Sequence, residues 1–257
     1  MQLNSAVQEG NVAKIVVSKT TPAMMNALRR TIINEVPVLA VHTIDFRAQT
    51  SALYDEMLAH RIGLNPITTD YSSYDYEDIK DENERSARSK LTLTLVAKGP
   101  IVVKASEIKS KDPAIKSVYP EMPLVKLDEG QELEFEATAI MGKGKQHAKW
   151  VPGIVSYYHE PVIKVNNPSP DKSTRENYPQ EIFNGTKIDS EKINTPELLD
   201  AVDGVDDSVL TIDKKSDSFV FLAESFGMIS PKEMIIRGVS ELTSMLDELQ
   251  KEVKRAL

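Results

Sequence analysis

The chain has 257 residues, of which 40% are apolar and 27% charged, and its formal net charge is −8. This composition indicates a globular protein of two or three domains, and the acidic balance argues against binding nucleic acid over a broad surface. The chain contains no cysteine, which excludes disulfides, thiolate metal sites and thiol nucleophiles. No run of residues is apolar and long enough to span a membrane, and the first residues lack the apolar stretch of a secretion signal, so we expect a cytoplasmic protein.

The first predicted elements are a strand and an amphipathic helix. The β-branched run 12–17 predicts the strand, and the helix is predicted over residues 21–37, with Pro22 suited to its first position. Apolar residues recur along this helix at steps of three and four: Met25, Leu28, Ile32 and Val36. Further apolar residues widen the stripe beyond what one underlying sheet needs.

The middle of the chain predicts mostly antiparallel sheet. A strand over 38–49 and a short helix over 51–62 come first, and strands then alternate with turns over 91–105 and 122–142. The stretch 70–89 is acidic and polar, with tyrosines as its aromatic residues, so we expect an exposed or poorly ordered loop.

The composition changes after a further strand that Pro161 is expected to interrupt. Residues 166–218 are rich in Asn, Pro, Ser and Asp, which predicts a small, loosely packed insert. Within it, we expect a helix over 196–202 and a short strand over 209–213. A second strand, over 219–225, is expected after the insert.

The last predicted element is a long helix that begins at Ser230 with a capping box and continues to the C-terminus. Its apolar residues follow a heptad seam: Ile235, Val239, Leu242, Leu246, Leu249 and Val253. With a rise of about 1.5 Å per residue, this helix is longer than a small domain is wide. Part of the seam therefore needs another surface to cover it.

Two groups of residues in the sequence resemble functional sites, one catalytic and one for binding nucleic acid. Asp55 or Glu56 with His60 could serve acid–base catalysis, but the plainer interpretation is the polar face of an amphipathic helix that is solvated or touches a partner. The basic loop 142–149, followed by Trp150, could track a nucleic-acid backbone. The favoured interpretation there is a flexible, solvated turn with the tryptophan anchored in the sheet, so nucleic-acid contact is expected to be absent or peripheral.

Three segments carry a resemblance to a known family. Residues 26–46 (NALRRTIINEVPVLAVHTIDF), 51–70 (SALYDEMLAHRIGLNPITTD) and 111–152 resemble, in this order, a region shared by three related polymerase subunits. These are the D-type subunit of archaeal RNA polymerases, the third-largest subunit of eukaryotic RNA polymerase II and, more distantly, the N-terminal domain of the bacterial alpha subunit. The resemblance spans nearly the whole chain.

The resemblance implies an α+β fold with three parts. A discontinuous dimerisation domain, made of a sheet and two long helices, would comprise residues 1–48 and 218–257, and a β-rich domain would be inserted at 49–160. Residues 161–217 would form a small, degenerate ferredoxin-like insert. The implied function is that of a non-catalytic subunit on which DNA-directed RNA polymerase assembles.

The resemblance also implies partners. A heterodimer with subunit L would use the opening and C-terminal helices, through Met25, Leu28, Ile32, Ile235, Val239, Leu242, Leu246, Leu249 and Val253. Docking to the second-largest subunit and to the small zinc subunits N and P would involve Arg29, Arg30, His60 and Arg61. A homodimeric binding module and a hydrolase using His60 with Asp55 or Glu56 remain as alternatives.

The chain departs from this family in its metal sites. Relatives hold an iron–sulfur cluster or zinc through cysteines, and this chain has none, so we expect no cofactor. Tyr178-Pro179 resembles the Cys-Pro segment of a ferredoxin half-motif with tyrosine in place of cysteine. The insert is therefore expected to keep the shape of a cluster domain and to depend on a small core alone.

Overall fold

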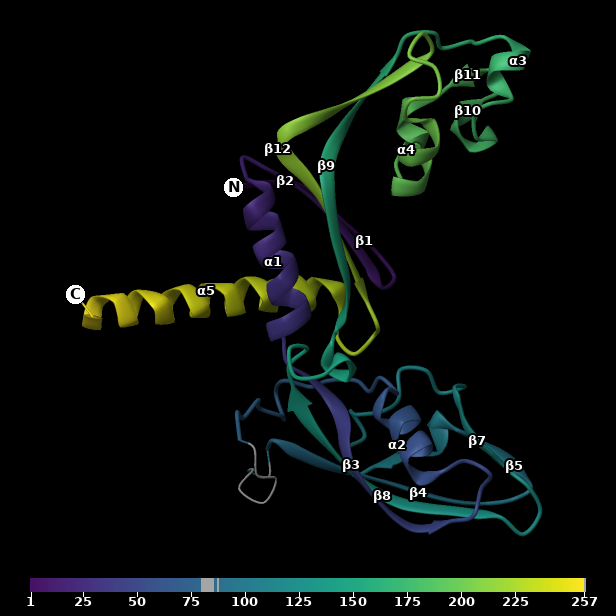
Figure 1. Ribbon diagram of the computed structural model, residues 1–257, viewed down its shortest axis with the longest axis vertical. Helices are drawn as coiled ribbons and strands as arrows, with labels where there is room; N and C mark the ends of the chain where they lie inside the picture. Colours follow the sequence, from purple (N-terminus) through teal and green to yellow (C-terminus); the bar gives the residue numbers. More distant parts are fainter. Residues whose placement is uncertain (80–85, 87, 257) are drawn as a thin grey trace. The chain divides into compact units, whose positions relative to one another are not determined.

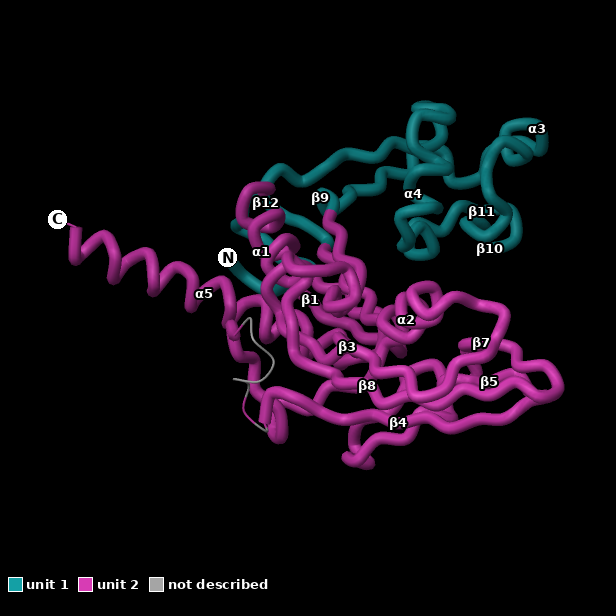
Figure 2. The backbone as a smooth tube through the Cα atoms, turned by 60° about the horizontal axis from the view of Figure 1, so that its bottom comes forward, with its two compact units in different colours: residues 1–4, 16–21, 158–220 teal, residues 5–15, 22–157, 221–257 magenta. Residues whose placement is uncertain are grey.

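The computed structural model describes residues 1–79, 86 and 88–256. These residues form two compact units (Figure 2). Unit 1 comprises residues 1–4, 16–21 and 158–220, and unit 2 comprises residues 5–15, 22–157 and 221–257. Both long helices and nearly all of the predicted β-rich domain therefore belong to unit 2, whereas the predicted insert lies in unit 1.

The main sheet of unit 2 is antiparallel and has β8 as a central strand. Its strands lie in the order β3 (Val38–Gln49), β8 (Glu132–Gly142), β4 (Lys90–Lys98) and β6 (Lys109–Ser110). Alternate residues of β8, from Leu133 to Ala139, are buried, as the two-residue period of a half-buried strand predicts. A separate ribbon pairs β5 (Ile101–Lys104) with β7 (Pro123–Leu127).

The short helix α2 (Asp55–Gly63) contacts β3 and β7 (Figure 1). It begins later than predicted, because Ser51 does not serve as its cap and Tyr54 precedes the first turn. Leu58 and Ile62 are fully buried on its inner face. This packing fixes the direction in which the polar residues of α2 point.

Helices α1 (Pro22–Glu35) and α5 (Pro231–Ala256) cross each other in unit 2 (Figure 1). Gly238 is buried at this crossing, and a Cβ atom added to it would lie 2.2 Å from Cγ1 of Ile32. The absence of a side chain at this position therefore allows the two backbones to approach closely. As predicted, the Ser230 hydroxyl caps α5, since it accepts a hydrogen bond from the backbone N–H of Glu233 at 3.2 Å.

A group of four charged side chains, which we call the lysine clamp, joins the end of β8 to both helices. Its members are Lys143, Lys145, Glu35 and Glu241. Nζ of Lys143 lies 3.3 Å from Glu35 Oε2 on α1 and 3.2 Å from Glu241 Oε2 on α5. Burial opposes the charge of Lys143, but the carboxylates of Glu241 and Glu35 outweigh it and raise the pKa of the ammonium.

The basic loop 142–149 is held by contacts within the chain and is not the flexible turn that the sequence predicted. Lys145 Nζ lies 2.9 Å from Glu35 Oε2, and the backbone N–H of Lys145 donates to the carbonyl of Asn34 at 3.1 Å. Trp150 is buried, as predicted, and its indole N–H donates to the carbonyl of Ile140 at 3.3 Å. Lys143 and Lys145 are therefore held by Glu35, and Lys149 lies over the ring of Trp150.

The described part of the predicted loop 70–89 also differs from expectation, and residues 80–85 and 87 of that prediction lie outside the described residues. The Tyr71 hydroxyl donates to the carbonyl of Pro37 at 2.7 Å, and its ring centroid lies 3.2 Å from Cζ of Arg237 on α5. Tyr74 is 8% exposed, and burial, together with a hydrogen bond to Asp112, raises its pKa to about 12. The tyrosines anchor this segment to unit 2.

Another sheet has the strand order β1 (Gln2–Glu9), β2 (Val12–Ser18), β12 (Leu210–Ser225) and β9 (Gly153–Val165). The two strands predicted over 209–213 and 219–225 form the single strand β12. Pro161 does not interrupt β9, because β9 lies at the edge of the sheet, where a missing N–H is tolerated. β1 was not predicted.

The insert in unit 1 has a small apolar core of its own. Its elements are α3 (Lys172–Arg175), β10 (Phe183–Asn184), β11 (Lys187–Ile188) and α4 (Pro196–Val202). The core residues are Tyr178, Ile182, Phe183, Ile188, Ile193, Val202, Val209 and Leu210. The predicted helix over 196–202 and the predicted small core are both confirmed.

Among the described residues, single 3₁₀ turns lie at Ala105–Glu107, Ala148–Trp150, Gln180–Ile182 and Ser190–Lys192. None of the helices in the described residues is both long enough and apolar enough to cross a membrane.

Replacing Gly238 by alanine should destabilise the protein. At an exposed helical position, replacing glycine by alanine raises the free energy of unfolding by about 1 kcal/mol. Here the new methyl group meets Ile32, and such overpacking lowers it by about 1–3 kcal/mol. Denaturant unfolding should show a lower free energy for Gly238→Ala. The exposed Ser240→Ala on the same helix is the control and should lose nothing. Equal stability of the two variants would contradict a close helix crossing.

The two lysines that share Glu35 should differ in their contribution to stability. The side chain of Lys143 is 14% exposed and that of Lys145 is 54% exposed. We expect Lys143→Met to lower the free energy of unfolding by about 1–3 kcal/mol, because it leaves carboxylates without their buried partner. The matched variant Lys145→Met should lose less than about 1 kcal/mol. A larger loss for Lys145→Met than for Lys143→Met would refute the conclusion that the more buried lysine contributes more to stability.

The contribution of Lys143 should also disappear at alkaline pH. Its pKa is raised in the folded chain, so its stabilisation is complete below the pKa of an unfolded lysine, about 10.4. The stabilisation is then lost as the pH rises through the higher pKa of the folded state. The difference in unfolding free energy between the wild type and Lys143→Met, measured from pH 8 upward, should therefore shrink only above roughly pH 10.

Candidate partner interface

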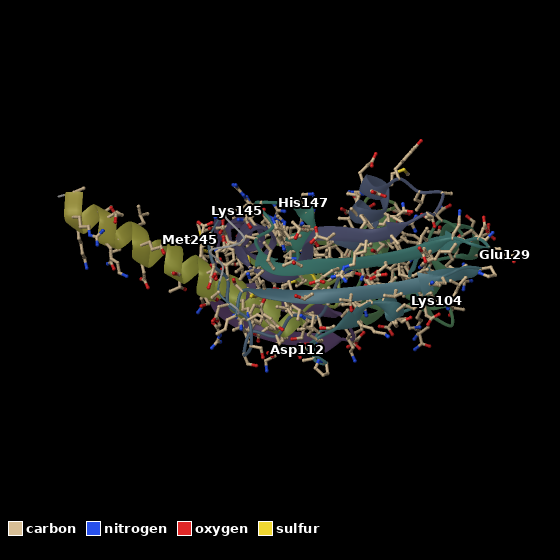
Figure 3. All side chains as sticks on the ribbon, turned by 90° about the horizontal axis from the view of Figure 1, so that it is seen from below. Lys104, Asp112, Glu129, Lys145, His147 and Met245 are labelled. Atoms are coloured by element: carbon tan, nitrogen blue, oxygen red, sulfur yellow. The ribbon has the colours of Figure 1, made fainter. Side chains whose placement is uncertain are left out.

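Beyond its crossing with α1, helix α5 exposes an apolar surface that we call the outer stripe. The outer stripe consists of Val239, Leu246, Leu249 and Val253, which are 49%, 55%, 60% and 46% exposed. Met245, 46% exposed, lies beside it, on the part of the helix that extends away from the body of unit 2 (Figure 3). The four residues of the outer stripe belong to the heptad seam predicted from the sequence, whereas Met245 does not.

The exposure of the outer stripe follows from the lengths of the two helices. α1 has 14 residues, so it is about 21 Å long, whereas the 26 residues of α5 extend for about 39 Å. Only Pro231, Met234 and Gly238 of α5 are buried, and every residue of 243–256 is exposed. Ile235 and Leu242, the other two seam residues, are half-buried.

The predicted interface residues of α1 face inward. Met25 and Ile32 are fully buried and Leu28 is 6% exposed. Their side chains are therefore enclosed within this chain and present no surface to a partner in this structure. Their position on α1 supports the packing that holds the first turns of α5.

The adjacent arginines of α1 point in different directions, as helical geometry requires. Arg29 is half-buried and donates from Nε and Nη2 to Oδ1 of Asn26, at 3.1 and 3.0 Å. Arg30 is exposed. Of the two predicted docking residues on α1, Arg30 is thus the more accessible.

The charged residues of α2 follow the helix dipole. Asp55 and Glu56 lie in its first turn and His60 and Arg61 in its last, where each sign of charge is favoured. Arg61 donates to the carbonyl of Pro123 at 2.8 Å. This placement explains the spacing of the acidic residues and the histidine without invoking catalysis. All four of these α2 residues are exposed.

His60 lines a cavity of about 150 Å³ in unit 2 that the sequence did not indicate. His42 from β3 and His147 and Lys149 from the basic loop also line it. Within the described residues, no three His, Asp or Glu side chains are placed to share a metal ion. The cavity thus brings three imidazole rings together with one lysine ammonium.

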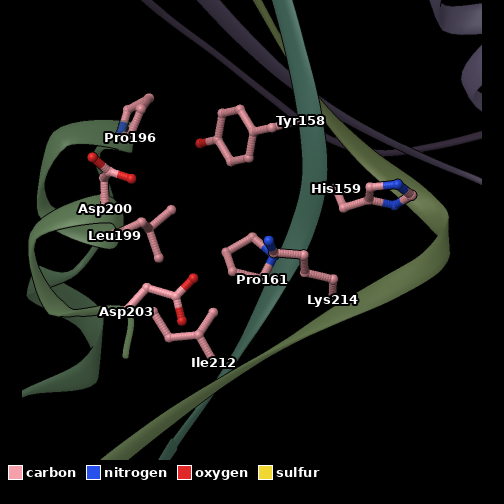
Figure 4. Close-up of a pocket in the computed structure, with 9 residues that line it drawn as sticks. All are labelled: Tyr158, His159, Pro161, Pro196, Leu199, Asp200, Asp203, Ile212 and Lys214. Atoms are coloured by element: carbon pink, nitrogen blue, oxygen red, sulfur yellow. The ribbon is translucent and has the colours of Figure 1, made fainter. Parts of the chain in front are cut away.

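A second cavity, of about 340 Å³, lies within unit 1 (Figure 4). Tyr158 and Leu199 contribute to its apolar wall, and Asp200 lies on α4 at its side. His159 points away from this group, to the other side of β9, where its Nδ1 lies 2.8 Å from the carbonyl oxygen of Lys215. The imidazole is thus engaged with the neighbouring strand.

Tyr178 occupies the position at which the family resemblance places a cluster cysteine. Its side chain is 4% exposed within the core of the insert, and its hydroxyl donates to the carbonyl of Asp206 at 3.4 Å. Burial raises the pKa of this phenol. A chain without thiols does not provide the donors of an iron–sulfur or zinc–thiolate site, and here the tyrosine ring fills apolar space instead.

Comparison with known proteins identifies relatives along the chain. The family described as RNA polymerase Rpb3/RpoA insert domain matches residues 43–152. DNA-directed RNA polymerase subunit Rpo3 of Methanosarcina acetivorans is 32% identical over 245 residues, which cover 92% of each chain. The protein of the same name from Halobacterium salinarum is 32% identical over 244 residues, covering 94% of this chain and 93% of the relative.

Other relatives match a shorter segment at higher identity. Subunit Rpo3 of Pyrococcus furiosus is 40% identical over 158 residues, and this match spans 62% of the chain but only 59% of the relative. Because two relatives above 30% identity match along more than nine-tenths of their length and of this sequence, the chain belongs to the archaeal DNA-directed RNA polymerase subunit Rpo3 family.

Proposed function

We propose that the chain is a non-catalytic assembly subunit of DNA-directed RNA polymerase and that it pairs with subunit L through the outer stripe of α5. The observation that carries this proposal is an apolar seam, about half exposed, on a helix whose first turns are already packed. A continuous exposed apolar surface of this kind is typical of a protein–protein interface. Membership of the Rpo3 family supports a role in transcription.

The spacing of the outer stripe favours a helical partner. The outer stripe belongs to a heptad seam whose residues recur at steps of four and three, which suits the insertion of side chains between those of a facing helix. α1 covers only the inner turns of α5, and the apolar face of α1 is consumed in doing so. The proposed interface is therefore narrower than the one expected from the sequence and is centred on α5.

We further propose that the exposed polar residues of α1 and α2 contact the larger assembly. Arg30, His60 and Arg61 are exposed, and these are the residues we assign to docking on the second-largest subunit and the small subunits N and P. Arg29, held by Asn26, supports this surface from the side. The lysine clamp occupies Lys143 and Lys145, which argues against a role for the basic loop in holding DNA. A cytoplasmic location accords with this function.

Placing a charge in the outer stripe should abolish pairing with subunit L. Leu246→Asp introduces a carboxylate into what becomes an apolar interface, and an unpaired buried charge costs several kcal/mol. We expect the affinity, measured by calorimetry with purified subunit L, to fall by at least about a hundredfold. Because Leu246 is 55% exposed, the variant should fold as the wild type does.

Ser244→Asp is the matched control, since it adds the same charge to the exposed polar side of the same helix. It should bind subunit L with unchanged affinity. The proposal fails if Leu246→Asp retains wild-type affinity. It also fails if the chain expressed alone forms a stable homodimer, by size-exclusion chromatography with light scattering, that does not respond to subunit L.

A further inference from the structure

Three of the four histidines of the chain meet at the cavity described above. We call this site the donor pocket and define it by His42, His60, His147 and Lys149. The other residues of its described lining are apolar or glycine, so no carboxylate of the described chain lines the cavity. A protein of net charge −8 thus keeps a small pocket that offers only nitrogen groups and apolar surface.

The hydrogen bonds around the donor pocket assign the ring protons. Nδ1 of His147 accepts the backbone N–H of Lys149 at 3.0 Å, which leaves the proton of the neutral ring on Nε2. Nζ of Lys149 lies 3.3 Å from Nδ1 of His42, and an ammonium can only donate, so the proton of the neutral His42 ring is also on Nε2. Both imidazoles are therefore hydrogen-bond donors on their second nitrogen.

A buried indole holds these donors in place. Trp150 is 5% exposed, and Nζ of Lys149 lies 4.4 Å from its ring centroid. The rings of His42 and His147 lie 5.6 and 6.4 Å from the same indole, centroid to centroid. The donors thus surround one rigid side chain and lose little freedom when they bind a ligand.

A larger, apolar cavity adjoins the donor pocket. It has a volume of about 240 Å³ and shares Leu64 and Lys149 with the donor pocket. Tyr119, Phe226 and Met228 also line it. Leu64 is 46% and Tyr119 47% exposed, so large apolar side chains lie open beside a site of donors.

We propose that this double cavity binds a segment of a partner protein in which an Asp or Glu carboxylate lies next to a large apolar side chain. The carboxylate would enter the donor pocket and accept hydrogen bonds from Lys149 and the imidazoles, while the apolar side chain would fill the adjoining cavity. The identity of the partner rests on the proposed function, in which α2 contacts other polymerase subunits. One of those subunits would supply the segment.

The observations favour a carboxylate over a phosphate. Among the described residues that line the donor pocket, Lys149 is the only fixed cation. A volume of about 150 Å³ holds one side chain. A nucleic acid would also meet the long-range repulsion of a chain with net charge −8.

The test uses the full chain and a pair of blocked peptides, N-acetyl-Leu-Glu-Leu-amide and its Gln counterpart. Histidine ring resonances are followed by NMR during each titration. The Glu peptide should shift the resonances of His42, His60 and His147, while His159, which lies in unit 1, stays unchanged. The Gln peptide, which lacks the charge, should bind at least about tenfold more weakly.

Two variants locate the site. Lys149→Gln removes the cation and should weaken binding of the Glu peptide at least about tenfold. His60→Ala, on the exposed face of α2, should also weaken this binding without disturbing the fold. Lys111→Gln, an exposed lysine elsewhere in unit 2, is the matched control and should bind as the wild type does. Circular dichroism verifies that each variant is folded.

Equal affinity for the Glu and Gln peptides would overturn the proposal, as would unchanged binding by both Lys149→Gln and His60→Ala. Tighter binding of inorganic phosphate or of a ten-nucleotide oligo(dT) at the same histidines would also overturn it in favour of a phosphate site. The peptide titrations require no other subunit. Failure of the wild-type chain to pair with subunit L would therefore refute the proposed function and leave this result unaffected.

Discussion

The close approach of α1 and α5 at Gly238 is the constraint on which unit 2 depends. Because the position opposite Ile32 carries no side chain, α1 packs closely against the backbone of α5, and Met25, Leu28 and Ile32 of α1 are buried. The crossing also brings Glu35, at the end of α1, and Glu241, about one turn beyond Gly238, to the same lysine. A single small residue thus permits the crossing that buries Ile32 against α5 and brings the two carboxylates together.

The lysine clamp extends this constraint to the sheet. Burying an ammonium is unfavourable, and Lys143 is tolerated because two carboxylates from different helices compensate for its lost hydration. The ring of Tyr71, stacked on Arg237, makes a second attachment to α5. The helix pair and the β-rich body are therefore joined by charged and aromatic contacts as well as by the chain itself.

Local signals allowed most helices and strands to be predicted, because periodicity, capping residues and prolines act over a few neighbours. These signals fail where residues far apart in the sequence determine the structure. β1 was missed because all of its residues are exposed and its sequence does not alternate. The stripe of Met25, Leu28 and Ile32 correctly indicated an apolar face, but periodicity does not reveal whether a partner or the same chain covers it. The donor pocket was missed because its residues come from three separate elements.

The unequal lengths of α1 and α5 have a consequence for the chain before it meets its partner. The last 14 residues of α5 are exposed all round, and an isolated helical segment of about this length is only marginally stable in water. Association with a partner on this surface would therefore stabilise these turns as well as cover them, by an amount that grows with the concentration of the partner. A chain made in excess of such a partner would therefore carry an exposed apolar end that an assembled chain would not.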